Sequence, residues 1–384
     1  MKIVGPKYGL RMAAMMASLL LPGQLKAQSL EFSGQAIGWA TINPADPFQV
    51  QGGLRYIPEL SFSVPLGQFT LDGEFSVNLW GTGTHQESTV PQWDYDLSPY
   101  RMWLRFSGNQ FELRAGLQKI NFGSAQLFRP LMWFDRIDPR DPLQLTDGVY
   151  GLLGRYYFLN NASIWLWGLY GEDNTKGWEV FPTVKNTIEY GGRVQLPLFT
   201  GEIGASYHHR TADPRSIAFD TVFQEDPSPE NRFAVDMKMD LAVGFWLEAA
   251  VIHQQLAFTS LEHTSMLNAG IDYTFGLGNG LSVMTEGFGY LQGKHLLEAN
   301  KKSWFGLLSL SYPINIIHSL SAMVFYDFSK ENLYRFINYS ITFDKWTFYF
   351  MGFWNPETYQ LYNIETQGTL YGGWGFQFMA VFNH

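Results

Sequence analysis

The chain contains no cysteine, which excludes disulfides, thiolate metal sites and anchoring through a lipidated cysteine. It also lacks long hydrophobic runs: after residue 27, no segment approaches the roughly 18 consecutive apolar residues that a membrane-spanning helix needs. Hydrophobic residues nevertheless make up 46% of the sequence. The apolar residues must therefore be spread along the chain in short segments or in alternation with polar ones.

The first residues combine basic charge with a short apolar run. Lys2, Lys7 and Arg11 flank or precede an apolar run over 12–21, and Ala27 closes the segment. This order predicts a cleavable export signal over 1–27, since the run is too short for an N-terminal membrane anchor. We expect residues 28–384 to form one domain. A strand that starts directly after the signal leaves no room for an N-terminal plug domain.

Positive charge is scarce in the remaining chain. Removing residues 1–27 takes away four of the 26 basic residues and none of the 35 acidic ones, so the balance becomes 22 − 35 = −13. Such acidity argues against nucleic acid as a partner. Aromatic residues, by contrast, reach 17%, as expected where two aromatic belts mark the membrane interfaces.

Polar and apolar residues alternate along the sequence. Between residues 68 and 79, for example, Asp72 and Glu74 fall on one face of a strand, while Leu71 and Phe75 fall on the other. A strand with this pattern separates two different solvents. We expect an all-β protein: a single transmembrane antiparallel up-and-down β-barrel of about 18 strands. The predicted strands cover 29–41, 52–65, 68–81, 98–107, 110–121, 148–159, 162–171, 186–197, 200–211, 230–241, 244–256, 264–275, 280–292, 303–313, 317–328, 332–343, 345–355 and 370–382.

The connections alternate between short and long. Short ones such as 65–67 and 107–109 carry the Gly, Pro and Asn of tight turns, whereas 82–97, 122–147, 172–185, 212–229 and 356–369 are long. Short turns should face the periplasm and long loops the exterior of a Gram-negative cell outer membrane. The expected partners are outer-membrane lipid and lipopolysaccharide. The alternating aromatics of the last strand resemble the signal that barrel-assembly machinery recognises.

Arginines follow the polar face of several predicted strands. Because neighbouring strands lie only about 4.8 Å apart, they could form a basic ladder that lines the pore. The alternative is that they pair with carboxylates across strands and stiffen the wall. The ladder comprises Arg101, Arg105, Arg114, Arg155, Arg193 and Arg232, and the carboxylates are Glu31, Glu59, Asp72, Glu74, Glu248, Asp272 and Glu286. A lumen with these charges should be watery.

The connection 122–147 mixes bulky apolar and charged residues. Phe128, Trp133 and Phe134 have little reason to lie in an external loop, so we expect the segment to fold into the barrel as a constriction. An external lid or a partner-binding loop is the alternative. Its carboxylates would face the arginine ladder and create a transverse field. The predicted constriction residues are Arg129, Asp135, Arg136, Asp138, Arg140 and Asp141.

The same segment resembles a known pattern. Leu117–Gly123, followed by Arg129-Pro130, Asp138-Pro139 and Asp141-Pro142, is similar to the strand-plus-constriction segment of substrate-specific outer-membrane porins. The alginate-export and related 18-stranded families come closest. The resemblance implies passive, selective diffusion through a monomeric barrel, and it carries over no particular solute.

Signals for catalysis are weak. His208 and His209 are adjacent in one strand, so they point to opposite faces and cannot share a metal ion. No G-x-S-x-G elbow or H-E-x-x-H helix occurs in the chain. We expect neither an enzyme nor a cofactor. Acidic loop clusters could hold calcium, although solvated loop carboxylates are the simpler interpretation. These clusters are Glu87, Asp94, Asp96 and Asp220, Glu225, Asp226.

The sequence therefore favours a channel for small polar or anionic solutes in the outer membrane. A second hypothesis is an accessory barrel in an outer-membrane assembly or secretion complex, with aromatic residues of the long loops docking partners. Those residues are Trp93, Tyr95, Phe219, Phe223, Tyr359 and Tyr362. A third is a hydrolase embedded in the barrel.

Overall fold

The computed structural model describes residues 29–137, 141–171, 174–217, 226–256, 259, 261–357 and 370–384. The predicted export signal over 1–27 lies outside the described residues. The strands are β1 Ser29–Asn43, β2 Gln49–Leu66, β3 Phe69–Gln86, β4 Gln92–Ser107, β5 Phe111–Gln118, β6 Val149–Tyr157, β7 Ser163–Tyr170, β8 Ile188–Leu198, β9 Gly201–Ala212, β10 Ser228–Asp240, β11 Gly244–Gln254, β12 His263–Phe275, β13 Leu281–Gly293, β14 Lys301–Pro313, β15 His318–Asp327, β16 Asn332–Thr342, β17 Trp346–Trp354 and β18 Trp374–Asn383.

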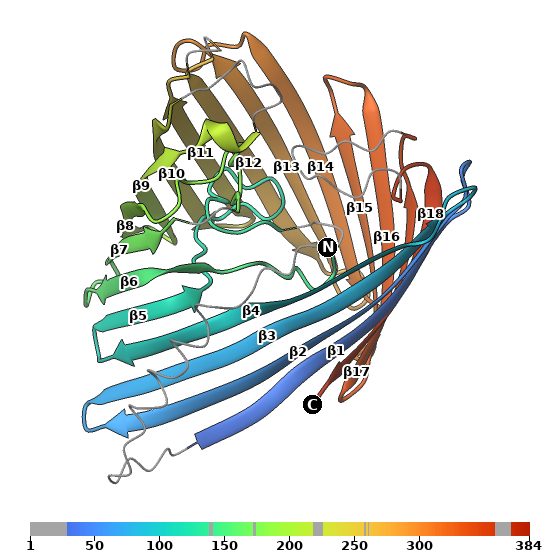
Figure 1. Cartoon of the computed structure of the whole chain (residues 1–384), viewed down its shortest axis with the longest axis horizontal. Helices are drawn as coiled ribbons and strands as arrows, with labels where there is room; N and C mark the ends of the chain where they lie inside the picture. Colours follow the sequence, from blue (N-terminus) through green and yellow to red (C-terminus); the bar gives the residue numbers. More distant parts are fainter. Residues whose placement is uncertain are drawn as a thin grey trace.

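The strands close into one barrel (Figure 1). Each strand pairs antiparallel with its neighbour in sequence, and β1 pairs with β18 from Gln35↔Asn383 to Ile42↔Phe376. This closure confirms the predicted all-β, 18-stranded antiparallel barrel. Among the described residues, one 3-10 turn, η1 Pro214–Ile217, is helical, and no helix there is long and apolar enough to cross a membrane.

Alternation along each strand sets an apolar outer face. Leu113, Leu152 and Leu166 are 44%, 50% and 64% exposed on the outside, whereas Leu153 and Trp167, one residue away in their strands, are buried inside. On β18 the aromatic face predicted from the sequence also points outward, with Phe376 61% exposed. The outer surface is therefore suited to lipid, as the alternation predicted.

The two ends of the barrel differ. Turns of a few residues join the strands at the end where β1 starts and β18 finishes, which we call the short-turn end. Long connections occur at the opposite, long-loop end, and they include 119–148, 171–187 and 355–373.

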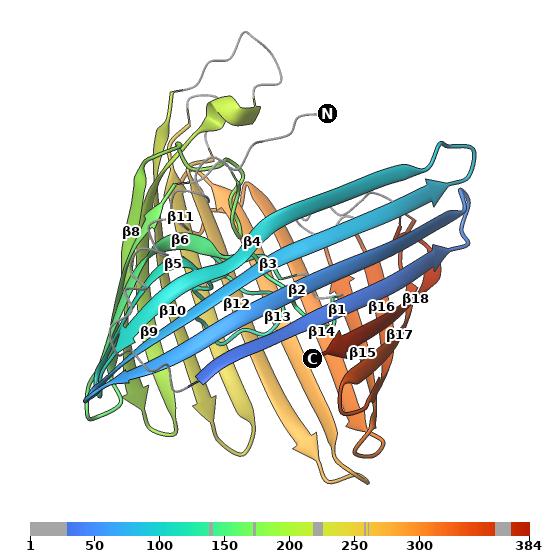
Figure 2. The same cartoon turned by 60° about the horizontal axis from the view of Figure 1, so that its bottom comes forward.

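One predicted loop is largely strand. Of residues 82–97, only 87–91 connect β3 and β4, because the antiparallel register continues from Trp80↔Asp96 to Thr84↔Gln92. The acidic residues Asp94 and Asp96 suggested a loop, yet they alternate with Trp93, Tyr95 and Leu97. As a result, β2 and β3 are 18 residues long, and β1 to β4 form the long, slanted wall of Figure 2.

Part of the interior is a dry core, which corrects the expectation of a watery lumen throughout. The inward aromatics Phe288, Phe305, Phe325 and Tyr334 of β13 to β16 are at most 3% exposed and pack together. The segment between β5 and β6 runs through the middle of the ring and supplies the rest of this core (Figure 1).

Candidate functional site in the barrel interior

The connection between β5 and β6 enters the barrel and is fixed to the opposite wall. Backbone N–H groups of Ser124 and Ala125 donate to the Glu248 carboxylate on β11, the latter at 2.7 Å. Glu286 on β13 accepts from the N–H groups of Gln126, Leu127 and Phe128 at 2.7, 3.2 and 3.0 Å. Both carboxylates lie on the inner face, so the structure confirms the predicted inward-folded loop.

Apolar packing supports the same attachment. Phe128 stacks on Phe288 with ring centroids 5.4 Å apart and also contacts Phe305 at 5.5 Å.

A glycine lets the loop backbone come close to the wall. Gly123 has a φ of +96°, and a Cβ there would lie 2.4 Å from Glu248 Oε1. Only glycine tolerates this combination, so it allows the backbone to approach the wall closely.

The far part of the connection reaches the other side of the barrel. Leu143 and Leu145 pack against Ile37 of β1 and against Met379 and Val381 of β18. The segment therefore crosses the interior from β11–β13 to β1 and β18 and narrows the lumen.

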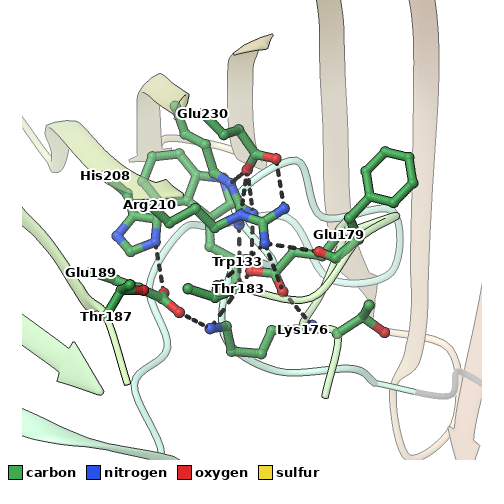
Figure 3. Close-up of polar contacts among 12 residues, drawn as sticks. Trp133, Lys176, Glu179, Thr183, Thr187, Glu189, His208, Arg210 and Glu230 are labelled. Atoms are coloured by element: carbon green, nitrogen blue, oxygen red, sulfur yellow. Dashed lines mark hydrogen bonds and ion pairs between the residues drawn. The ribbon is translucent and has the colours of Figure 1, made fainter. Parts of the chain in front are cut away.

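A second connection, between β7 and β8, is held by a buried network of charges (Figure 3). Its Glu179 contacts Arg232 Nη2 at 3.0 Å and Arg210 Nη1 at 3.5 Å. Glu230 of β10 completes the group, because it contacts each of these arginines at 2.6 Å. The Glu179, Arg210 and Arg232 side chains have no solvent exposure. Buried charges of this kind persist only where they are paired.

The network extends to both inward-folded connections. Lys176 contacts Glu189, which also lies 3.1 Å from His208 Nε2, and Arg232 Nη1 donates to the Trp133 carbonyl at 3.3 Å. Sequence reasoning missed most of this group. The sequence could have shown that Glu230 and Arg232, two residues apart in one strand, share a face. It could not have placed Glu179, because a loop residue follows no alternating pattern.

Three of the six predicted ladder arginines are buried, and one of them, Arg232, belongs to the network described above. Arg193 forms a two-bond pair with Asp236 at 2.5 and 2.8 Å and is 3% exposed. Arg101 donates to the carbonyls of Thr146 and Tyr100 at 2.8 and 2.6 Å. Arg193 thus fits the alternative of pairing with a carboxylate across strands, whereas Arg101 joins the wall to the inward-folded loop.

Three other ladder residues retain exposed surface on the inner face near the short-turn end. We call Arg105, Arg114 and Arg155, whose side chains are 34%, 15% and 16% exposed, the arginine cluster. Arg105 pairs with Asp72 at 2.9 Å, and Glu112 lies 3.0 Å from Arg114 and 3.7 Å from Arg155.

Tryptophan rings hold the arginine cluster in place. The Arg114 guanidinium lies 4.7 Å from the ring centre of Trp103, and that of Arg155 lies 3.8 Å from Trp165. Arg105 and Arg114 are direct cross-strand partners, so two like charges stand side by side. Asp72 and Glu112 are the ion-pair partners of these three guanidiniums, and the Glu74 carboxylate on β3 also acts electrostatically on Arg114. This part of the wall therefore presents partly exposed guanidiniums beside carboxylates.

The loop carboxylates that the structure describes make their ion pair and hydrogen bonds within the loop itself. Among the described residues, Asp135 pairs with Arg129 of the same loop at 3.4 Å, and Asp141 accepts the N–H groups of Leu143 and Leu145. Arg136 donates to Thr175 at 2.7 Å. Among the ladder arginines, Arg105 and Arg155 pair with carboxylates of a neighbouring strand, and Arg114 pairs with Glu112 of its own strand. Asp138 and Arg140 lie outside the described residues.

The described residues offer no group of three or more His, Asp or Glu side chains placed to hold a metal ion. Of the acidic clusters considered for calcium, Asp220 and Glu225 lie outside the described residues. His208 is buried inside the barrel, whereas His209 contacts Tyr190 and Asn231 on the other face, as the strand alternation predicted.

The chain was compared with protein families, curated sequences and solved structures. No family model matches the chain. No curated protein sequence matches it either. Crystal structures of Acinetobacter baumannii OccAB1 and Pseudomonas aeruginosa OccD3 (OpdP) each align over 94% of this chain, and over 99% and 94% of their own, at 10% identity with a TM-score of 0.55. OmpT, an outer membrane protein of Vibrio cholerae, aligns over 94% of this chain and 100% of its own at 13% identity with a TM-score of 0.51. The chain thus shares the barrel fold of these proteins over nearly its whole length.

Proposed function

We propose that this protein is a non-catalytic outer-membrane channel for passive, selective diffusion of small polar or anionic solutes. The arginine cluster carries the proposal, because it presents positive charge on the inner wall while the inward-folded loop restricts the path. Fixed charge beside a narrow aqueous path raises the local concentration of counter-ions and so favours anions.

The outer face of the barrel and the predicted export signal support a location in the outer membrane. An apolar outer face with aromatic rows fits lipid, and the export signal predicted over 1–27 fits delivery to the outer membrane. The likeness to OmpT, an outer membrane protein, points the same way.

The test is ion selectivity of the purified full-length barrel in planar bilayers under a salt gradient. The wild type should conduct and favour anions. Arg114→Ala should lower the anion-to-cation permeability ratio about two- to threefold, because a unit charge acting through water over several ångströms is worth roughly 0.5 kcal/mol. Glu112→Gln should raise the ratio, since it removes a negative charge from the same cluster.

Arg215→Ala is the matched control, because Arg215 is 51% exposed and pairs with Asp213 next to η1, outside the strands. It should leave the ratio at the wild-type value. A folded barrel without conductance, or an Arg114→Ala variant with unchanged selectivity, would contradict the proposal.

The accessory-barrel hypothesis has one supporting observation. Trp93 and Tyr95 near the long-loop end of β4 are 76% and 83% exposed. A barrel that does not conduct and that stays bound to stoichiometric protein partners in detergent would favour this second function.

A further inference from the structure

The outer face of the barrel carries a groove across β15 to β18. Its volume is about 660 Å³, within the roughly 300–1,000 Å³ typical of ligand sites. Two cross-strand rows build it. Val324, Arg335, Trp354 and Trp374 form one row, and Ala322, Ile337, Gly352 and Phe376 form the next. Small residues at Ala322 and Gly352 leave a hollow between the larger side chains.

The groove lies close to the long-loop end. Trp354 is the last residue of β17, Trp374 is the first of β18, and Arg335 is the fourth of β16. Tryptophan at this level is typical of the membrane interface, where an apolar ring meets polar headgroups.

Arg335 is the charged member of an otherwise apolar lining. Its guanidinium lies 4.2 Å from the ring centre of Trp354, and its Nε donates to the Trp354 carbonyl at 3.0 Å. Within the described part of the chain, its terminal amino groups have no carboxylate partner. An ionisable residue on a lipid-facing surface is costly unless it meets a partner, so its presence indicates a function.

We propose that this groove binds an anionic, phosphate-bearing lipid of the leaflet at the long-loop end. An acyl chain would lie along Ala322, Ile337 and Gly352, and the phosphate would accept hydrogen bonds from the Arg335 terminal amino groups. Arginine suits this role because its planar donors match phosphate oxygens, and Trp354 already fixes the guanidinium plane.

Charge complementarity favours a phosphate lipid over a second copy of the chain. Two copies docked groove to groove would bring their Arg335 guanidiniums together, so like charges oppose that contact, whereas a phosphate complements the same charge. On the outer face of neighbouring β14, exposed Lys302 adds positive charge, with Glu331 as an exposed carboxylate in the turn before β16. The proposal rests on the barrel spanning a membrane, but it concerns the outer face and not the lumen.

The experiment counts lipid on the purified full-length barrel by native mass spectrometry, with bis-phosphorylated lipid A as the probe. One molecule should remain on the wild type at low probe concentration. Arg335→Leu should weaken apparent binding about tenfold or more, as expected when a charge-assisted hydrogen-bonding partner is lost. Arg335→Lys should bind with intermediate strength, because it keeps the charge but loses the planar donors.

Two further variants test whether the lipid binds specifically in this groove. Lys345→Leu removes one positive charge at the short-turn end and should bind like the wild type. Gly352→Leu fills the groove and should reduce binding, and heat-modifiable gel migration shows whether each variant is folded.

The proposal is overturned if Arg335→Leu retains the probe like the wild type, or if lipid A stripped of its phosphates binds equally well. It is also overturned if the groove instead holds a second barrel, seen as a dimer mass that Gly352→Leu abolishes. Its failure is distinguishable from failure of the channel, because conductance and selectivity report on the lumen and the lipid count reports on the outer face.

Discussion

At the scale of single residues, arginine occurs inside this barrel in two settings. Arg193, Arg210 and Arg232 are almost fully buried, and each has carboxylate partners at hydrogen-bonding distance. Arg105, Arg114 and Arg155 keep part of their surface exposed beside tryptophan rings. Burial thus separates arginines that hold the wall and the loops from those that can meet a solute. The selectivity changes expected for Arg114→Ala and Glu112→Gln belong to the second group.

The buried network supplies a stability prediction. Glu179→Gln removes the loop carboxylate between Arg210 and Arg232 and leaves Glu230 to serve both. Breaking a buried pair costs about 3–5 kcal/mol. The temperature at which the folded barrel loses its heat-resistant gel migration should therefore fall clearly below that of the wild type.

Asp213→Asn is the matched control for this prediction. It makes the same carboxylate-to-amide change at the ion pair with Arg215, where both side chains are partly exposed. Exposed pairs contribute little to stability, so the control should unfold at the wild-type temperature. Equal unfolding temperatures for Glu179→Gln and the wild type would show that the network is not stabilising.

At the scale of elements, the inward-folded loop depends on carboxylates that belong to the wall. Glu286 accepts hydrogen bonds from three consecutive backbone N–H groups, and Glu248 accepts from two more. Phe128 adds an aromatic contact on the same side. A loop attached in this way has a fixed position, and in the proposed channel that position would set the width of the path.

Weakening this attachment should change the channel current. Glu286→Gln retains the size of the side chain but replaces one accepting oxygen with an amide nitrogen, which cannot accept an N–H. We expect greater open-channel noise in single-channel recordings, because the loop moves more often from its position. Asp272→Asn on the neighbouring inner wall has no described hydrogen bond to the loop and serves as the control. Identical noise spectra for the two variants would contradict the attachment.

At the scale of the whole molecule, closure satisfies the strand edges. β18 pairs with β17 on one side and with β1 on the other, the latter over eight residue pairs from Gln35 to Ile42. In lipid, every unpaired backbone group costs several kcal/mol, so an open edge is not tolerated. The barrel therefore folds as a unit that depends on its last strand.

Deleting residues 374–384 should abolish the folded state. Without β18, β1 and β17 would both expose unpaired edges, and the chain should no longer show heat-modifiable migration or resist protease. A two-glycine insertion between Phe199 and Thr200 lengthens a turn at the short-turn end without removing a strand pair, and it should fold. Normal folding of the truncated chain would show that β1 to β17 can close by themselves.

The sequence determined which residues face lipid and which face the interior, because side chains alternate along a strand whatever its neighbours are. It therefore predicted the strands, the apolar outer face and the inward loop, whose bulky side chains needed a buried place. It did not determine the partners of each arginine, since these depend on how adjacent strands are staggered and on where a loop lands. Only the tertiary structure brings Glu179 between Arg210 and Arg232, 31 and 53 residues further along the chain, and pairs Asp72 with Arg105. The same stagger places Arg335 beside Trp354 on the outer face, a contact that no local pattern could predict.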